Sequence, residues 1–174
     1  MNLKKWSIIG TCALAIIIML SFTFTKKNEE KKLVEVKYHE VSRQSQKQID
    51  CLAKNIYREA VGEPRDGWLA VGMVTMNRVE SGKFGRDVCS TVYQKVGKTY
   101  QFSWVKIEKK MSKINYLIYN DIVELATMIY YNHDRLDDMT GGATFYHADY
   151  VNPKWKGLEK TSQIGRHVFY RQDI

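Results

Sequence analysis

Apolar residues recur at helical spacing near the middle of the chain. In residues 50–61 (DCLAKNIYREAV), Leu52 and Ile56 fall on one face of a predicted helix. Asp50 is a suitable N-cap, because its carboxylate can accept hydrogen bonds from the free N–H groups of the first turn. Gly62 is a natural stop. The pattern therefore predicts a helix over residues 50–61.

Two further stretches are predicted to be helical. Residues 68–79 (WLAVGMVTMNRV) are apolar almost all the way round, which indicates the buried central helix of a small domain, with Asn77 and Arg78 as polar exceptions. Residues 114–133 have an amphipathic pattern. Its apolar face holds Ile118, Ile122, Leu125 and Ile129.

The rest of this region consists of short runs and turn signals. Residues 88–94 fit a short helix or strand, and residues 97–104 (GKTYQFSW), aromatic and polar without periodicity, predict an irregular loop. Gly-Gly and Asn-Pro steps in residues 140–157 predict a loop or short hairpin, and residues 166–171 a last short strand. The predicted fold class is mainly α, of the α+β kind: a helical domain with a small β element.

A long uncharged stretch precedes these elements. Residues 6–25 (WSIIGTCALAIIIMLSFTFT) carry no charge, and as a helix they would span about the hydrocarbon core of a bilayer. No small-x-small cleavage pattern follows, so an uncleaved membrane anchor is favoured over a cleaved signal peptide. Residues 26–49, rich in Lys, Glu, Gln and Ser, are expected to be a solvated tether. The folded body would then be residues 50–174, facing the periplasm or exterior.

Cys51 and Cys89 lie in this body. Export would place them in an oxidising compartment, where a pair of cysteines is expected to join. The alternative is two buried thiols.

Charge and motifs exclude several function classes. The net charge of +8 divides evenly: residues 1–50 hold nine Lys and Arg against five Asp and Glu, and residues 51–174 hold eighteen against fourteen. The body therefore lacks the strong basic excess typical of nucleic-acid binding. It also lacks a Gly-rich phosphate loop, a G-x-S-x-G elbow and the HExxH or paired CxxC spacing of zinc sites. We expect no metal, no cofactor and no nucleic-acid partner.

The strongest candidate for chemistry is the run EAVGEP, which places Glu59 and Glu63 four residues apart where a helix gives way to a turn. The negative end of the helix dipole tends to raise the pKa of Glu59, as a general acid acting on a glycosidic bond requires. Such pairs are also common on solvated helices. Two aromatic-rich loops, GKTYQFSW and ATFYHADY, would line a groove and stack on sugars.

Four motifs in order resemble the cell-wall hydrolase family that includes the spore-cortex-lytic enzymes. They are NIYREAVGEPRDGWLAVGMVTMNRV, QFSW, ATFYHADYVNPKW and IGRHVFYR, and they cover about residues 50–171. The resemblance implies a lysozyme-like, mainly helical fold related to lytic transglycosylases, with Glu59 as the catalytic acid. Arg58 stands where the family usually has an aromatic residue, and Val61 where it has Arg.

The resemblance also implies which residues meet the substrate, the glycan strands of peptidoglycan. These are Gln101, Phe102 and Ser103 of the QFS segment and Tyr146 and His147 of the YH segment, and we add Glu63 to them.

The expected reaction cleaves the bond between N-acetylmuramic acid and N-acetylglucosamine and leaves a 1,6-anhydromuramoyl end. The alternatives are a hydrolytic muramidase, in which Glu63, Asp66 or Asp149 activates a water, a zinc-dependent amidase, and a non-catalytic wall-binding module.

Overall fold

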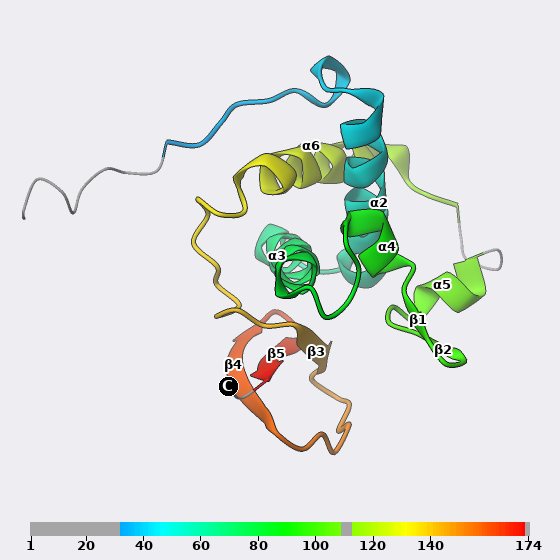
Figure 1. The fold of residues 1–174 in the computed structure, drawn as a ribbon, viewed down its shortest axis with the longest axis vertical. Coiled ribbons are helices and arrows are strands. Elements are labelled where there is room, and N and C mark those ends of the chain that lie inside the picture. The colour runs from blue at the N-terminus through cyan, green and yellow to red at the C-terminus, as the bar shows by residue number, and fades with distance from the viewer. Residues whose placement is uncertain (1–31, 109–112, 173–174) are drawn as a thin grey trace, which may run out of the picture. The chain divides into compact units, whose positions relative to one another are not determined.

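Three helices form the helical layer of the computed structural model, which describes residues 32–108 and 113–172. They are α2 (Arg43–Ala60), α3 (Arg65–Ser81) and α6 (Tyr116–Asn132), and each packs against the other two (Figure 1). The predicted anchor, residues 6–25, lies outside the described residues. Among the helices that are described, none is long and apolar enough to cross a membrane.

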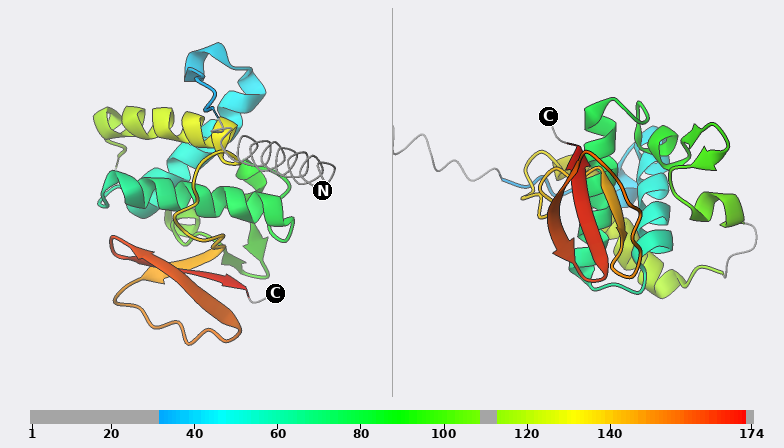
Figure 2. Two further views of the ribbon diagram at one scale, coloured as in Figure 1. Left: turned by 90° about the vertical axis from the view of Figure 1, so that its left-hand side faces the viewer. Right: turned by 90° about the horizontal axis from the view of Figure 1, so that it is seen from below.

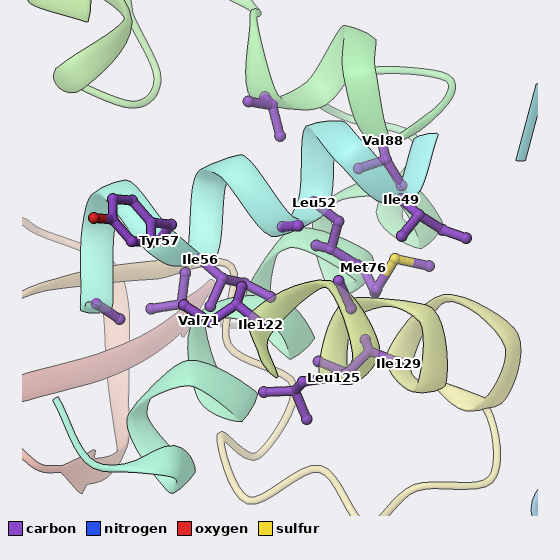
Figure 3. Close-up of a cluster of buried hydrophobic side chains, with 14 of the residues drawn as sticks. Ile49, Leu52, Ile56, Tyr57, Val71, Met76, Val88, Ile122, Leu125 and Ile129 are labelled. Atoms are coloured by element: carbon purple, nitrogen blue, oxygen red, sulfur yellow. The ribbon is translucent and has the colours of Figure 1, made fainter. Parts of the chain in front are cut away.

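The core lies between these three helices (Figure 3). Leu52 and Ile56 of α2 have no exposed surface, which confirms the predicted apolar face. Gly72 of α3 allows the close approach, because a Cβ there would lie 2.5 Å from the Ile129 Cδ1 atom of α6. The central helix and the amphipathic helix predicted from periodicity are thus both present.

Helix α2 begins at Arg43, seven residues before the predicted start. Its N-cap is Ser42, whose hydroxyl accepts a hydrogen bond from the Ser45 N–H at 3.1 Å. Asp50 instead accepts a 2.7 Å hydrogen bond from the Tyr38 hydroxyl. The first turns of α2 are polar in sequence, so periodicity did not reveal them, yet Ile49 is fully buried. Residues 43–49, assigned to the tether, therefore belong to this helix.

Shorter elements follow α3. Helix α4 (Val88–Val92) confirms the short element predicted over residues 88–94. Residues 97–104, predicted as an irregular loop, instead contribute to the hairpin of β1 (Lys95–Val96) and β2 (Thr99–Tyr100) and to the start of α5 (Trp104–Ile107). A 3₁₀ turn, η1 (Tyr38–Glu40), precedes α2. Cys51 of α2 and Cys89 beside it in α4 form a disulfide, as predicted for an exported chain.

A three-stranded antiparallel sheet completes the fold. Its strands are β3 (Phe145–Ala148), β4 (Leu158–Ile164) and β5 (His167–Gln172), in the order β3-β5-β4. The sheet lies on the side of α3 away from α6 (Figure 2). Phe169 of β5 packs against Ala70 and Val74 of α3. The structure confirms a helix-rich α+β domain.

Candidate active site

Glu59 lies in the last turn of α2, where it meets the sheet. The Tyr146 hydroxyl, carried by β3, donates a hydrogen bond to Glu59 Oε2 at 3.0 Å across 87 positions of sequence. Side chains alternate between the faces of a strand, so Tyr146 shares the inner face of the sheet with its register partner Phe169. The sheet thereby positions a phenol on the carboxyl group predicted to be the acid.

The surroundings of Glu59 favour its protonated form. Burial raises the pKa of Glu59, while the hydrogen bond from Tyr146 and the positive charge of Arg78 oppose that shift without cancelling it. Its place at the negative end of α2 acts in the same direction as burial. For its part, Tyr146 has a pKa raised well above its usual value by burial and by Glu59, so it remains a hydrogen-bond donor.

Arg78 is the buried cation of this region. Only 4% of it is exposed, and its Nε donates to the Thr144 carbonyl at 2.7 Å. Its guanidinium lies 4.9 Å from the ring centre of Phe84 and 4.6 Å from that of Phe102. Its Nη1 atom is buried with no hydrogen-bond partner among the described residues. The cation is therefore held by aromatic faces and one carbonyl.

Glu63 has a different environment from Glu59. Its Oε2 accepts a hydrogen bond from the Arg166 N–H at 2.9 Å, in the turn between β4 and β5. Gly165 permits this approach, since a Cβ there would lie 2.1 Å from Glu63 Oε2. Glu63 thus fastens the β4–β5 turn to the start of α3.

The other candidate carboxylates are also placed. Asp149 lies 3.9 Å from Arg166 Nε, and Asp66 is exposed in the first turn of α3. The interactions that shift the pKa of Glu59 come from Tyr146 and Arg78 and include neither carboxylate.

The three residues of the QFS segment have different surroundings. Phe102 is 2% exposed and its ring lies against Arg78, so it supports the buried cation, and its contact with substrate stays a prediction. Ser103 is exposed and Gln101 is half-buried. Trp104, the next residue, is anchored by its indole N–H, which donates to Asn55 Oδ1 of α2 at 2.9 Å.

His147 lies on the other face of β3 from Tyr146. Its Nε2 is 3.1 Å from the Tyr170 hydroxyl, and the two rings stack with centres 5.2 Å apart. The YH pair therefore does not act as a unit beside Glu59, because consecutive residues of a strand point to opposite faces.

A polar network that the sequence did not single out positions β3. Asp138 accepts hydrogen bonds from Asn77 Nδ2 at 2.9 Å and from the N–H groups of Thr140 and Gly142, both at 2.8 Å. Burial opposes ionisation of Asp138, but these bonds outweigh it and lower its pKa. The one available signal was Asn77, a polar residue on an otherwise apolar helix. The network fixes the segment that leads into Tyr146.

Metal ligands do not gather at this site. In the part of the chain that the structure describes, no group of three or more His, Cys, Asp or Glu side chains has an arrangement able to hold a metal ion.

Comparison with known proteins identifies the fold. A family model described as Cell Wall Hydrolase matches residues 62–170. The chain belongs to the cell wall hydrolase family. The match begins three residues after Glu59. The resemblance inferred from the four motifs is thereby confirmed.

Relatives of this cell wall hydrolase include the spore cortex-lytic enzyme of Bacillus cereus, 30% identical over 129 residues. The alignment covers 72% of this chain but 44% of that enzyme, so the chain spans less than half of this relative. A second relative, the spore cortex-lytic enzyme of Halalkalibacterium halodurans, is 28% identical over 127 residues, and the alignment covers 35% of that enzyme.

Two solved structures are similar. The catalytic domain of the Bacillus cereus SleB protein matches with a TM-score of 0.55 and 29% identity, over 72% of this chain and 91% of that domain. The catalytic domain of a germination-specific lytic transglycosylase, SleB from Bacillus anthracis, matches with a TM-score of 0.55 and 27% identity. This match covers 76% of this chain and 98% of that domain.

Proposed function

We propose that this chain is a lytic transglycosylase of peptidoglycan, with Glu59 as its single catalytic acid and base. The observation that carries the proposal is the environment of Glu59: partly buried at a helix end, with a raised pKa and one phenol donor on its carboxyl group. Membership of the family supports the same substrate, and the similarity to SleB from B. anthracis, a germination-specific lytic transglycosylase, supports the same reaction.

The reaction needs one carboxyl group that gives and then takes a proton. Protonated Glu59 donates its proton to the glycosidic oxygen as the bond from that oxygen to the muramoyl anomeric carbon breaks. The carboxylate then removes the proton of the muramoyl 6-hydroxyl, whose oxygen bonds to the anomeric carbon. A 1,6-anhydro end forms, Glu59 is protonated again, and no water is consumed.

Tyr146 and Arg78 would assist the middle of this cycle. Both interact more favourably with the carboxylate than with the carboxylic acid. They therefore stabilise Glu59 at the moment when its proton has left, and interactions that strengthen along the reaction are those that raise the rate.

A hydrolytic muramidase is the alternative within the same family. It would need a second carboxylate to activate water across the scissile bond. Glu63 is engaged by the Arg166 N–H and Asp149 lies beside the Arg166 side chain, which favours the mechanism that uses Glu59 alone.

The proposed location is outside the cytoplasm, where peptidoglycan is found. The disulfide between Cys51 and Cys89 agrees with an oxidising compartment. Residues 6–25 would hold the domain at the membrane.

The assignment of Glu59 is tested with the full-length chain and its Glu59→Gln variant, whose amide oxygen can still accept the Tyr146 hydrogen bond. We expect the variant to keep its circular dichroism spectrum and to lose at least a thousandfold in the clearing of purified sacculi. Glu63→Gln is the matched control and should retain most activity. A Glu59→Gln variant with full activity would overturn the assignment.

A further inference from the structure

The outer face of the sheet carries a pocket that takes no part in the chemistry at Glu59. It encloses about 310 Å³, at the small end of ligand pockets, and is lined by His147, Tyr170 and residues 151–155 of the β3–β4 loop, with Leu158. This loop runs on the side of the sheet away from α3 (Figure 2).

Aromatic rings form one wall of the pocket. His147 stacks on Tyr170, and the Trp155 ring meets both edge to face, at 71° to His147 and 88° to Tyr170, with ring centres 5.6 Å and 5.8 Å away. Trp155 is 43% exposed although neighbouring rings contact it. The indole is thus held in place by neighbouring rings while much of its surface stays open, which leaves it available to stack on a ligand.

The polar members of the pocket define its ligand. Lys154 supplies an ammonium group and Asn152 an amide, while none of the described residues that line the pocket is acidic. Lys156, also exposed, adds a second positive charge in the same loop. Aromatic rings suit the apolar C–H surface of a sugar ring, and the lysines suit a carboxylate. Two lysines are too few for the multiple phosphate contacts of nucleic-acid binding.

The pocket lies close to the proposed active site but is separate from it. Within β3, Tyr146 points to Glu59, whereas its neighbour His147 belongs to the pocket. The ring of Trp155 also contacts Phe145, with centres 5.9 Å apart, and Phe145 contacts Phe84 at the same distance. Phe84 in turn lies against Arg78. One continuous row of rings therefore leads from the pocket to the buried cation of the active site.

We propose that this pocket is a second glycan-binding site, which holds an N-acetylated amino sugar with its carboxylate-bearing substituent, away from the bond that is cleaved. This inference rests on the proposed function, which identifies the polymer as peptidoglycan. The binding contact itself is inferred from the residues that line the pocket. A second attachment to one polymer raises the effective concentration of glycan at Glu59 without any new contact there.

Binding is measured without turnover. Full-length Glu59→Gln protein is mixed with purified sacculi, and bound protein is determined by sedimentation, in parallel with Glu59→Gln/Trp155→Ala. We expect the second variant to bind roughly tenfold more weakly, as loss of a Trp at the centre of a contact does elsewhere. Tyr150→Ala in the same background is the matched control: this ring is 75% exposed in the same loop but does not line the pocket, and binding should not change.

Lys154→Gln separates the two parts of the ligand. In the Glu59→Gln background it should weaken binding to sacculi at least threefold, while binding to neutral chito-oligosaccharides stays the same. Lys154→Gln also tests the pocket if Trp155→Ala destabilises the fold and lowers the thermal midpoint, because Lys154 is exposed and its replacement should leave the fold intact. Sacculi binding unchanged in both folded variants overturns the inference, and so does binding to anionic lipid vesicles that depends on Trp155.

Failure of this inference is distinct from failure of the proposed function. With Glu59 intact, Trp155→Ala should cleave short soluble glycan fragments at the normal rate and solubilise sacculi more slowly. If Glu59→Gln still cleaves, the proposed function fails, and the inference is then judged from the rates at which Trp155→Ala cleaves short fragments and sacculi.

Discussion

Replacing Tyr146 with Phe isolates the hydrogen bond that joins the sheet to the proposed acid. The change removes one oxygen atom, whose hydroxyl donates to Glu59 Oε2 at 3.0 Å. A hydrogen bond to a charged group contributes about 1.5–3 kcal/mol, and one between neutral groups about 0.5–1.5 kcal/mol. Only the difference, roughly 1–1.5 kcal/mol, appears as Glu59 passes from acid to carboxylate. The expected loss in kcat is therefore about fivefold to tenfold.

The Tyr146→Phe variant should also shift the pH dependence of activity in a defined direction. The bond favours the carboxylate, so its loss raises the pKa of Glu59 further. Because Glu59 must be protonated to donate, activity falls at alkaline pH, and this alkaline limb should move to higher pH in Tyr146→Phe. Release of soluble muropeptides from sacculi across a range of pH measures both effects.

A matched control is Tyr130→Phe, which removes the hydroxyl of a Tyr of α6 whose ring packs edge-on against that of Tyr131. Its pH profile should equal that of the unaltered protein. If Tyr146→Phe lowers the rate without moving the limb, or moves it to lower pH, the argument that Tyr146 stabilises the Glu59 carboxylate is refuted.

Three further predictions concern stability. Glu59→Gln should raise the thermal midpoint at pH 7, because burial opposes the charge that Glu59 carries above its raised pKa. The gain should vanish below the ordinary pKa of 4.5, where Glu59 is neutral in both the folded and the unfolded chain. An equal gain at both pH values would contradict the pKa argument. The Cys51→Ser/Cys89→Ser variant should lose about 4 kcal/mol in free energy of unfolding, from the entropy of a loop closed across 38 positions, and reductant should then have no further effect on its urea midpoint. Asp138→Asn should lose about 1–3 kcal/mol at pH 7, since an amide cannot accept all the bonds of the carboxylate. Because the pKa of Asp138 is lowered, that difference should be full above the ordinary value of 3.8 and shrink as pH falls through the folded-state pKa; a difference independent of pH would show that its charge is not involved.

Local patterns predicted the helices whose burial is strongly one-sided or complete. Residues 68–79 were recognisable because nearly every side of α3 is covered, and Leu52 and Ile56 marked the buried face of α2. The first turns of α2 were missed, because their long polar side chains hid the helix. Strand β4, with the sequence LEKTSQI, was missed for a related reason: it is an edge strand with several exposed side chains and shows no regular apolar alternation.

The sequence predicts a site residue when its place within a single helix or strand is enough to perturb its chemistry. Glu59 at a helix end could be singled out from sequence, whereas its partner Tyr146 comes from a strand 87 positions away, and only the fold joins them. Phe102 and His147 were assigned because the QFS and YH segments resemble those of the family. Neighbours in sequence need not share surroundings: Phe102 turns inward onto Arg78, and the period of two along β3 sends His147 to the opposite face from Tyr146.

The mass of the products tests the central claim most directly. Purified sacculi are digested to completion with the full-length protein, and the soluble muropeptides are analysed by mass spectrometry. Transfer within the substrate predicts muramoyl ends that are one water lighter than reducing ends and that incorporate no label from ¹⁸O-water at the anomeric carbon. Reducing muramoyl ends that carry ¹⁸O would contradict the account, because they require a water molecule activated by a second carboxylate.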